Sequence, residues 1–299
     1  MEFGIEVPAY RRYPTPATLG RLAQMAEELG YESLWAPDHV VIPPTAGNSY
    51  RLGGHTYDPF SALGYAAAVT KRIKLATGVI VLAYRHPLAV AKHMATLDQM
   101  SGGRVIAGVG VGHLRDEFAA LGVPFDERGD RTDEAIGLIS EAWTSEGLHF
   151  EGQYYHVHDV VLEPRPVQRP RPPIVVGGNT RRAIRRAAEL GDGWYPVQRT
   201  PEQARQGVAL LKELCEAQGR PMVTVSALTH WVRLGQRASG QDGQRQPFSG
   251  GIEEMRADVR AYEAAGVTRL VLSTLAAEDE ASLFQMVETF AKQVMGKEG

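Results

Sequence analysis

Hydrophobic positions along the chain form two alternating patterns. Short runs of almost only apolar or small residues predict buried β-strands, and longer segments with apolar residues every three or four positions predict amphipathic helices. The predicted strands are 3–7, 33–37, 73–82, 104–111, 173–178, 193–197, 223–228 and 269–273. The predicted helices are 17–29, 59–70, 88–100, 131–145, 181–190, 202–218, 252–265 and 279–294.

The strict alternation of strand and helix predicts a parallel sheet, because near-continuous apolar strands joined by helices pair through right-handed crossovers. Eight such units favour a closed TIM (β/α)8 barrel over an open, doubly wound sheet. We expect a single domain over residues 1–299. In a barrel of this kind, chemistry takes place at the carboxyl ends of the strands.

Three segments depart from this rhythm. Residues 145–172, between the fourth and fifth strands, alternate apolar and polar positions around Gly152 like a hairpin and continue into a proline-rich connector. Residues 236–251 are polar and rich in glycine, so we expect a mobile loop there. Together with the long segment 41–58, this loop is expected over the barrel mouth, where both would select the substrate.

Composition narrows the class of protein. The chain has 299 residues and a formal net charge of −3, which argues against nucleic-acid binding. No apolar stretch is long enough for a membrane span, and the N-terminus lacks the pattern of a signal peptide, so a cytoplasmic enzyme is expected. The single cysteine, Cys215, falls at helical spacing with apolar residues and is interpreted as core packing.

The strand ends supply few ionisable groups. Asp38 and His39 follow the second strand, Thr77 and Gly78 lie within the third, and His113 follows the fourth, after a stretch that includes Gly110. The first strand has no histidine for a hydrolase-type metal site, the fourth has no carboxylate for a glycosidase, and no lysine ends a strand. A barrel mouth with few ionisable side chains suits a planar cofactor that supplies the reactive group itself.

No metal site is predicted. The one His-x-His pair, His156 and His158, falls in the insertion, where a solvated hairpin face is the better interpretation.

The stretch "IVVGGNT" (174–180) ends a strand where a helix begins. Backbone N–H groups at such a point are uncovered and face an anion. Gly177, Gly178, Asn179 and Thr180 are therefore candidates for binding a phosphate, and Arg181 and Arg182 could add charge. The alternating glycines of "GVGVGH" (108–113) lack the spacing of a dinucleotide-binding fingerprint.

Longer stretches resemble a known family. "ELGYESLWAPDHV", "ATGVIVLAYRHPLAVAKHMATLDQMSGGRVIAGVGVG", "FEGQYY" and "PIVVGGNTRRAIRRAAELGDGWYP" together resemble the luciferase-like monooxygenase superfamily, and more closely its branch that uses coenzyme F420, a deazaflavin. The resemblance implies a TIM barrel with an insertion between strands four and five, a flavin or deazaflavin at the mouth, and a homodimer.

The resemblance also assigns residue roles. It places His39 by the reactive face of the deazaflavin as proton donor or acceptor, with Asp38 or another neighbour setting its tautomer and His113 as a second candidate. Gly78 and Val79 match a bulge that is often a non-prolyl cis peptide. The residues expected to bind the cofactor are Asp38, His39, Thr77, Gly78, Val79, Gly110, Tyr155, Gly177, Gly178, Asn179 and Thr180.

The function predicted on this basis is hydride transfer between coenzyme F420 and a small organic substrate. One position departs from the branch: its sugar-phosphate dehydrogenases carry a glutamate where this chain has Val111. Two rivals remain open, an FMN-dependent monooxygenase and a non-catalytic flavin-binding protein, and an ionisable His39 counts against the second.

Overall fold

The computed structural model describes residues 1–8, 14–43, 56–240 and 243–296. Its main sheet is parallel and closes on itself, because β3 pairs with β5 as well as with β2. The predicted TIM barrel is therefore confirmed. Its strands are β1 (Glu2–Glu6), β2 (Ser33–Ala36), β3 (Lys74–Thr77), β4 (Ile80–Val81), β5 (Val105–Gly110), β8 (Ile174–Gly177), β9 (Gly193–Tyr195), β10 (Thr224–Trp231) and β13 (Arg269–Ser273).

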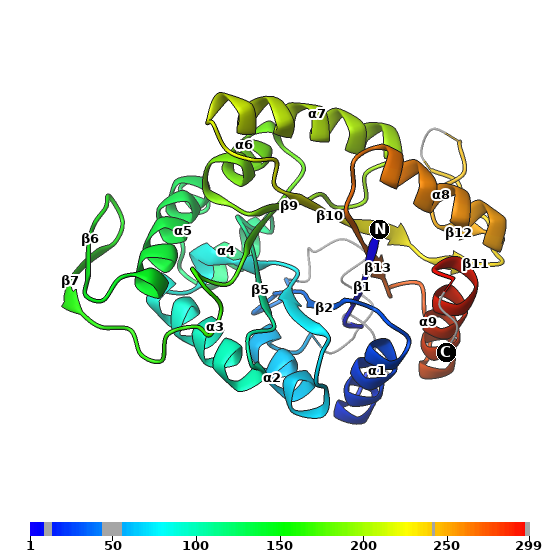
Figure 1. The fold of residues 1–299 in the computed structure, drawn as a ribbon, viewed down its shortest axis with the longest axis horizontal. Helices are drawn as coiled ribbons and strands as arrows, with labels where there is room; N and C mark the ends of the chain where they lie inside the picture. The colour runs from blue at the N-terminus through cyan, green and yellow to red at the C-terminus, as the bar shows by residue number, and fades with distance from the viewer. Residues whose placement is uncertain (9–13, 44–55, 241–242, 297–299) are drawn as a thin grey trace.

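Helices surround the barrel and cover its outer face (Figure 1). Local sequence fixes where they begin: Thr15 and Thr200 form capping boxes before α1 and α7, each followed by proline at the first helical position. The helices are α1 (Pro16–Glu28), α2 (Pro59–Val69), α3 (Pro87–Ser101), α4 (Arg115–Ala120), α5 (Arg128–Thr144), α6 (Arg181–Leu190), α7 (Pro201–Ala217), α8 (Ile252–Ala264) and α9 (Glu280–Thr289).

Side chains fill the inside of the barrel. Trp35 from β2 and Tyr195 from β9 are both buried there, and their rings stack with centroids 4.7 Å apart. Around them pack buried apolar side chains from β3, β5, β8, β10 and β13. The barrel is therefore plugged across its middle, and a ligand can enter only above this layer of side chains.

The third predicted strand is broken in two. The sequence predicts one strand over 73–82, but β3 ends at Thr77 and β4 begins at Ile80. Between them the Gly78–Val79 peptide bond is cis, as the sequence analysis expected. Gly78, the glycine within the apolar run, marks the point of the break.

A short helix, α4, was not predicted. It occupies residues 115–120, just before α5, and carries the buried Glu117. Six residues are too few to show a helical period, so the sequence pattern could not reveal it.

The insertion contains the expected hairpin, formed by β6 (Leu148–Glu151) and β7 (His156–Val160). It stands out from the barrel beside α5 (Figure 1). The carboxylate of Glu134 on α5 accepts hydrogen bonds from the backbone N–H groups of Gln153, Tyr154 and Tyr155. The turn of the hairpin is thus tied to the barrel.

The described parts of the segment 236–251, residues 236–240 and 243–251, include a short strand. This strand, β12 (Ser249–Gly250), pairs with β11 (Arg233–Leu234). Phe248 is fully buried, and Arg245 bonds the carboxylate of Asp258 on α8. These contacts could not be predicted from the composition of the segment, which is mostly polar and has Phe248 as its one aromatic residue. Most of the other predicted mouth loop, 44–55 within 41–58, lies outside the described residues.

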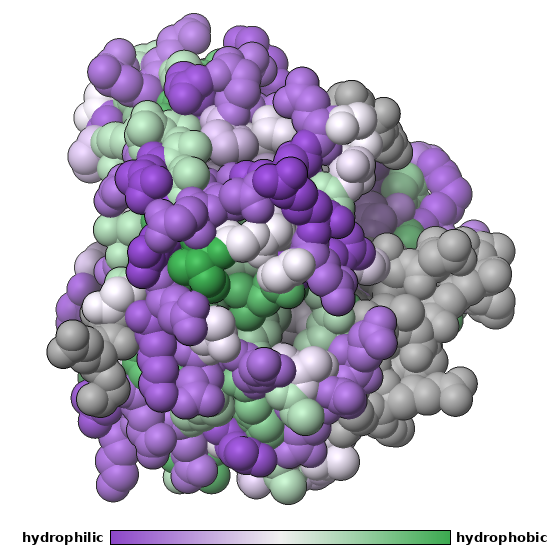
Figure 2. All heavy atoms as spheres, turned by 90° about the vertical axis from the view of Figure 1, so that its right-hand side faces the viewer, coloured by the Kyte–Doolittle hydropathy of each residue, from purple (hydrophilic) through white to green (hydrophobic). Residues whose placement is uncertain are grey.

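The side of the molecule that carries α9 and β11 is mainly hydrophilic, with hydrophobic residues at the bottom of a hollow (Figure 2). A cavity of about 620 Å³ lies between β11, the start of α8 and α9. Among the described residues, no helix combines the length and the hydrophobicity that crossing a membrane would require.

Candidate active site

A cavity of about 750 Å³ opens at the carboxyl ends of the barrel strands. It brings together residues that lie far apart in sequence, from the ends of β1, β2, β5, β8 and β9. The predicted site residues that line it are Asp38, His39, Gly78, Val79, Gly110, His113, Gly177, Gly178, Asn179 and Thr180.

Two predicted cofactor-binding residues, Thr77 and Tyr155, are not among those that line the cavity. The Thr77 side chain is fully buried and donates its hydroxyl hydrogen bond to the carbonyl of Gly108, 2.6 Å away on β5. Tyr155 lies at the turn of the hairpin, where its ring packs edge-on against His86. Both side chains are thus engaged in packing elsewhere.

Glycines at one wall of the cavity make room for the side chain of Val79. A Cβ atom built on Gly110 would lie 2.6 Å from the side chain of Val79, and one on Gly177 would lie 3.0 Å from it. Gly78 lies against Trp35 and Tyr195, the stacked pair inside the barrel. The side chain of Val79 is thus fixed at this wall by the close approach of the neighbouring strands.

His39 is held by a carboxylate that the sequence did not single out. Its Nδ1 lies 2.8 Å from Oε2 of Glu117, whose side chain is completely buried. The other oxygen of Glu117 accepts a hydrogen bond of 2.8 Å from the backbone N–H of Val40, and Tyr84 donates its hydroxyl to Oε2. These contacts fix the plane of the imidazole at the cavity wall.

Electrostatics keep Glu117 ionised. Burial alone would raise its pKa, but the hydrogen bonds from His39, Tyr84 and Val40 outweigh burial and bring the pKa below its ordinary value. A carboxylate that accepts a hydrogen bond from Nδ1–H keeps the proton of the neutral ring on Nδ1. Nε2 is then the basic nitrogen of the imidazole. The partner that sets the tautomer is therefore Glu117.

Asp38, the alternative partner, has a different set of contacts. Its two oxygens accept hydrogen bonds from the guanidinium of Arg85, at 2.7 and 2.9 Å. Oδ2 also accepts one from the backbone N–H of Val81, just after the cis peptide. Asp38 lines the cavity, but these bonds make it a support for β4.

His113 lies opposite His39, with ring centroids 6.1 Å apart and planes at 84°. Burial lowers the pKa of His113; the neighbouring His39 adds to this shift and Glu117 opposes it. The neutral form of its ring is therefore favoured.

Glu6, at the end of β1, is an ionisable group that the sequence analysis did not select. It lines the cavity, is 5% exposed and accepts a hydrogen bond of 3.1 Å from the hydroxyl of Ser273. Burial raises its pKa from 4.5 to about 7, against the opposing effect of the hydrogen bonds from Ser273 and Thr274. Near neutral pH this carboxyl group exists in both protonation states.

The turn predicted to bind an anion leads into α6, but the N–H of Gly178 donates a hydrogen bond of 3.1 Å to the carbonyl of Tyr195. Gly178 has a φ of +129°, and Thr180 caps α6 by accepting a hydrogen bond from the N–H of Ala183. The amide of Asn179 is bonded to both backbone groups of Val197, at 2.9 and 3.0 Å. Asn179 therefore fastens the turn to the end of β9.

Arginines gather around this end of the cavity. Arg128, Arg182 and Arg186 line it, but Arg182 and Arg186 are paired with Asp130 and Asp133 on α5. The buried Nε of Arg128 has no hydrogen-bond partner among the described residues. A donor of this kind beside a helix N-terminus suits an oxygen-rich anion such as phosphate.

The cavity therefore fits a planar ligand with a phosphorylated tail. The glycine wall would receive the rings, and the turn at 177–180 with Arg128 would receive the phosphate.

The fold and the position of the cavity define a TIM-barrel protein with its site at the carboxyl ends of the strands. The chain belongs to the luciferase-like monooxygenase family, whose family model matches residues 1–291. The resemblance noted in the sequence is thus confirmed.

Relatives with described activities differ in their cofactors. An F420-dependent glucose-6-phosphate dehydrogenase of Amycolatopsis mediterranei is 36% identical over 183 residues, which cover 60% of this chain and 53% of that protein. An FMNH2-dependent dimethylsulfone monooxygenase of Pseudomonas putida is 35% identical over 179 residues, covering 58% of this chain and 47% of that protein.

The crystal structure of the monooxygenase RslO1 from Streptomyces bottropensis matches with a TM-score of 0.84 over 99% of both chains, at 24% identity. At this identity the match supports the fold alone. In sequence, the chain is similar to an oxidoreductase that uses F420 and to a monooxygenase that uses FMNH2.

Proposed function

We propose that the protein is a coenzyme F420-dependent oxidoreductase that transfers a hydride between the deazaflavin and a small organic substrate. The observation that carries this proposal is the imidazole of His39, held by the buried carboxylate of Glu117 at the wall of a glycine-lined cavity. A cavity for storage alone has no need of a fixed imidazole, and this argues against a non-catalytic flavin-binding protein.

The residues of the cavity would hold such a cofactor in two places. Gly78, Val79 and Gly110 would form the surface for the tricyclic ring, and the N–H groups of Asn179 and Thr180, at the start of α6, would bind the phosphate. When bound, the deazaflavin supplies a ring carbon that accepts or gives a hydride.

The protein supplies the proton that balances hydride transfer. His39 accepts or donates it at Nε2, because Nδ1 is bonded to Glu117, which also stabilises the imidazolium while the proton resides there. Glu6, with a pKa of about 7, is a second group that exchanges a proton near neutral pH. Val111 lines the cavity where sugar-phosphate dehydrogenases of this branch carry a glutamate, so a different substrate is expected.

An FMN-dependent monooxygenase is the second candidate, supported by the relative from Pseudomonas putida. The same turn would bind the phosphate of FMN.

Titration of the purified protein separates the two cofactors. We expect coenzyme F420 to bind at least tenfold more tightly than FMN, and quenching of the fluorescence of each cofactor measures both dissociation constants. Tight binding of FMN with no binding of F420 would replace the first function by the second. Failure of both to bind would contradict the proposed site.

Replacing Gly178 by alanine is expected to weaken binding of the cofactor about tenfold. Its φ of +129° disfavours any side chain, and the new Cβ would lie 2.9 Å from the Cβ of Ala183 at the first turn of α6. The N–H groups of the turn would then shift away from the phosphate. The same fluorescence titration measures the change.

Gly122→Ala is the matched control, because Gly122 also has a positive φ, +69°, but its added Cβ would meet nothing within 4 Å and it does not line the cavity. It should bind the cofactor like the wild type. Unaltered affinity in Gly178→Ala would show that this turn does not hold the phosphate.

A further inference from the structure

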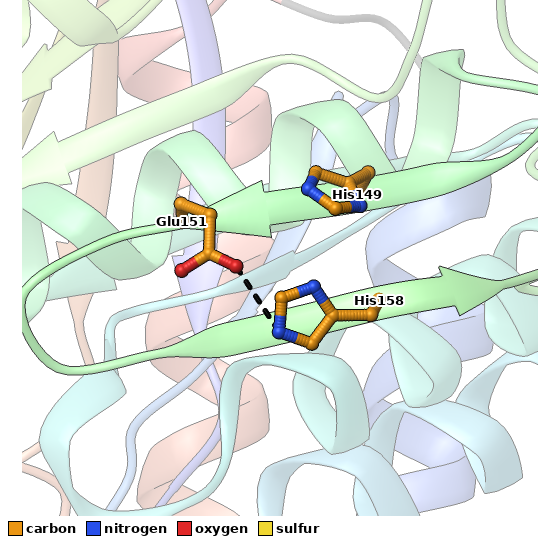
Figure 3. Close-up of side chains that lie close together, drawn as sticks. All are labelled: His149, Glu151 and His158. Carbon is orange, nitrogen blue, oxygen red and sulfur yellow. Dashed lines mark ion pairs between the residues drawn. The ribbon is translucent and has the colours of Figure 1, made fainter.

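The β6–β7 hairpin presents three potential metal ligands on one face. His149 and Glu151 lie two residues apart on β6, so their side chains point to the same side of the strand. His158 lies on the antiparallel strand β7 and completes the group. Figure 3 shows His149 and Glu151 on one strand and His158 on its neighbour, all on the same side of the hairpin.

These side chains are close enough to share one ion. Nε2 of His158 lies 3.1 Å from Oε1 of Glu151, and the rings of His149 and His158 have centroids 4.9 Å apart. One ligand atom from each of the three residues lies within 4.8 Å of the other two. Ligand atoms in a tetrahedral zinc site are about 3.3 Å apart, a spacing that small rotations of exposed side chains would reach.

The donor set selects the kind of metal. Two imidazole nitrogens and one carboxylate oxygen suit Zn²⁺ and neighbouring divalent transition metals, whereas Mg²⁺ and Ca²⁺ prefer oxygen ligands alone. Three protein ligands also leave a fourth position of a tetrahedral ion open to water.

A neighbouring side chain orients one of the ligands. Nδ1 of His156 lies 2.9 Å from the second oxygen of Glu151, and the carboxylate of Asp159 lies 3.9 Å from Nδ1 of His149. The hydrogen bond between His156 and Glu151 is a contact of the kind that orients a ligand in metal sites, whereas Asp159 is too far from His149 for a hydrogen bond.

We propose that His149, Glu151 and His158 form a binding site for a divalent transition metal ion of the Zn²⁺ type. None of the three lines the barrel cavity, so the site is separate from the proposed active site. An ion bound here joins β6 to β7 and closes the hairpin on the face opposite to the residues packed on α5. The sequence pattern pointed only to the pair His156 and His158, because the ligands His149 and Glu151 come from the other strand.

Isothermal titration of the full chain, carrying no histidine tag, with ZnCl2 tests the site. The wild type is expected to bind one Zn²⁺ per chain, and His149→Ala and His158→Ala to bind it at least tenfold more weakly. Titration with CoCl2 is expected to give visible absorption bands in the wild type that are lost in both variants. Glu151→Gln keeps the shape of the side chain and is expected to weaken binding as well.

His93→Ala is the matched control, since His93 is an exposed histidine on α3 that stacks on Phe60, outside the hairpin. It should bind Zn²⁺ like the wild type. Equal affinity in all the proteins, or no binding by the wild type, would overturn the proposed site.

Discussion

Replacing His39 by alanine is expected to lower the turnover number about 10²-fold while leaving cofactor affinity within a few-fold of the wild type. The reason is that the imidazole, whose Nδ1 is held by Glu117, moves the proton that accompanies hydride transfer. Turnover is measured as the change in visible absorbance of the deazaflavin, on the best substrate from a panel of small alcohols, aldehydes and ketones.

Two further variants, one at the cavity wall and one behind His39, separate proton transfer from simple loss of contact. His113→Ala removes an imidazole of equal size 6.1 Å from His39, and its turnover should fall less than tenfold. Glu117→Gln keeps His39 in place but removes the charge that stabilises the imidazolium, so its loss should be intermediate, with a shifted pH profile. If His39→Ala turns over at the wild-type rate, the imidazole has no part in the reaction.

The sequence predicted the barrel because its information is local and repeated. Each strand is a short apolar run, each helix has its own period, and the closed fold follows from their alternation. The rim residues His39 and Gly177 to Thr180 were also found locally, since they follow strand ends directly.

Glu117 could not be found in this manner. It lies 78 residues from His39, on a helix too short to show a period, and only the folded chain brings the two side chains together. For the same reason the sequence could not decide that Asp38 bonds Arg85 and leaves His39 to another carboxylate.

Glu6 did leave a signal in the sequence. Phe3, Ile5 and Val7 pack in the core under the helices, so the alternating positions Gly4 and Glu6 point into the barrel. A carboxylate at an inward position near the carboxyl end of a strand is expected at the mouth. Treating the run as one apolar block concealed this alternation.

Replacing Glu6 by glutamine is expected to stabilise the cofactor-free protein at alkaline pH and to flatten the pH dependence of its stability. Glu6 has a pKa of about 7 in the folded protein and 4.5 as its ordinary value, so between these values the folded state binds more protons than the unfolded state. The extra proton bound by Glu6 stabilises the folded state fully below about pH 4.5. This stabilisation is lost as the pH rises through about 7. Because of this one group, the free energy of unfolding of the wild type is about 3 kcal/mol lower at alkaline pH than at acidic pH.

Glutamine removes the titration and keeps an amide oxygen that can accept the hydrogen bond from Ser273, so the packing at the end of β1 is retained. Urea unfolding gives the free energy of unfolding of the wild type and of Glu6→Gln at about pH 5 and at about pH 8. The effect is measured as the change, between the two pH values, in the difference between the two proteins. Glu146→Gln, which removes an exposed carboxyl group before β6, is the matched control for the loss of a carboxyl group. If the free energies of unfolding of Glu6→Gln and of the wild type change equally with pH, Glu6 is already ionised in the folded protein at about pH 5. Glu6 would then be no proton donor at neutral pH.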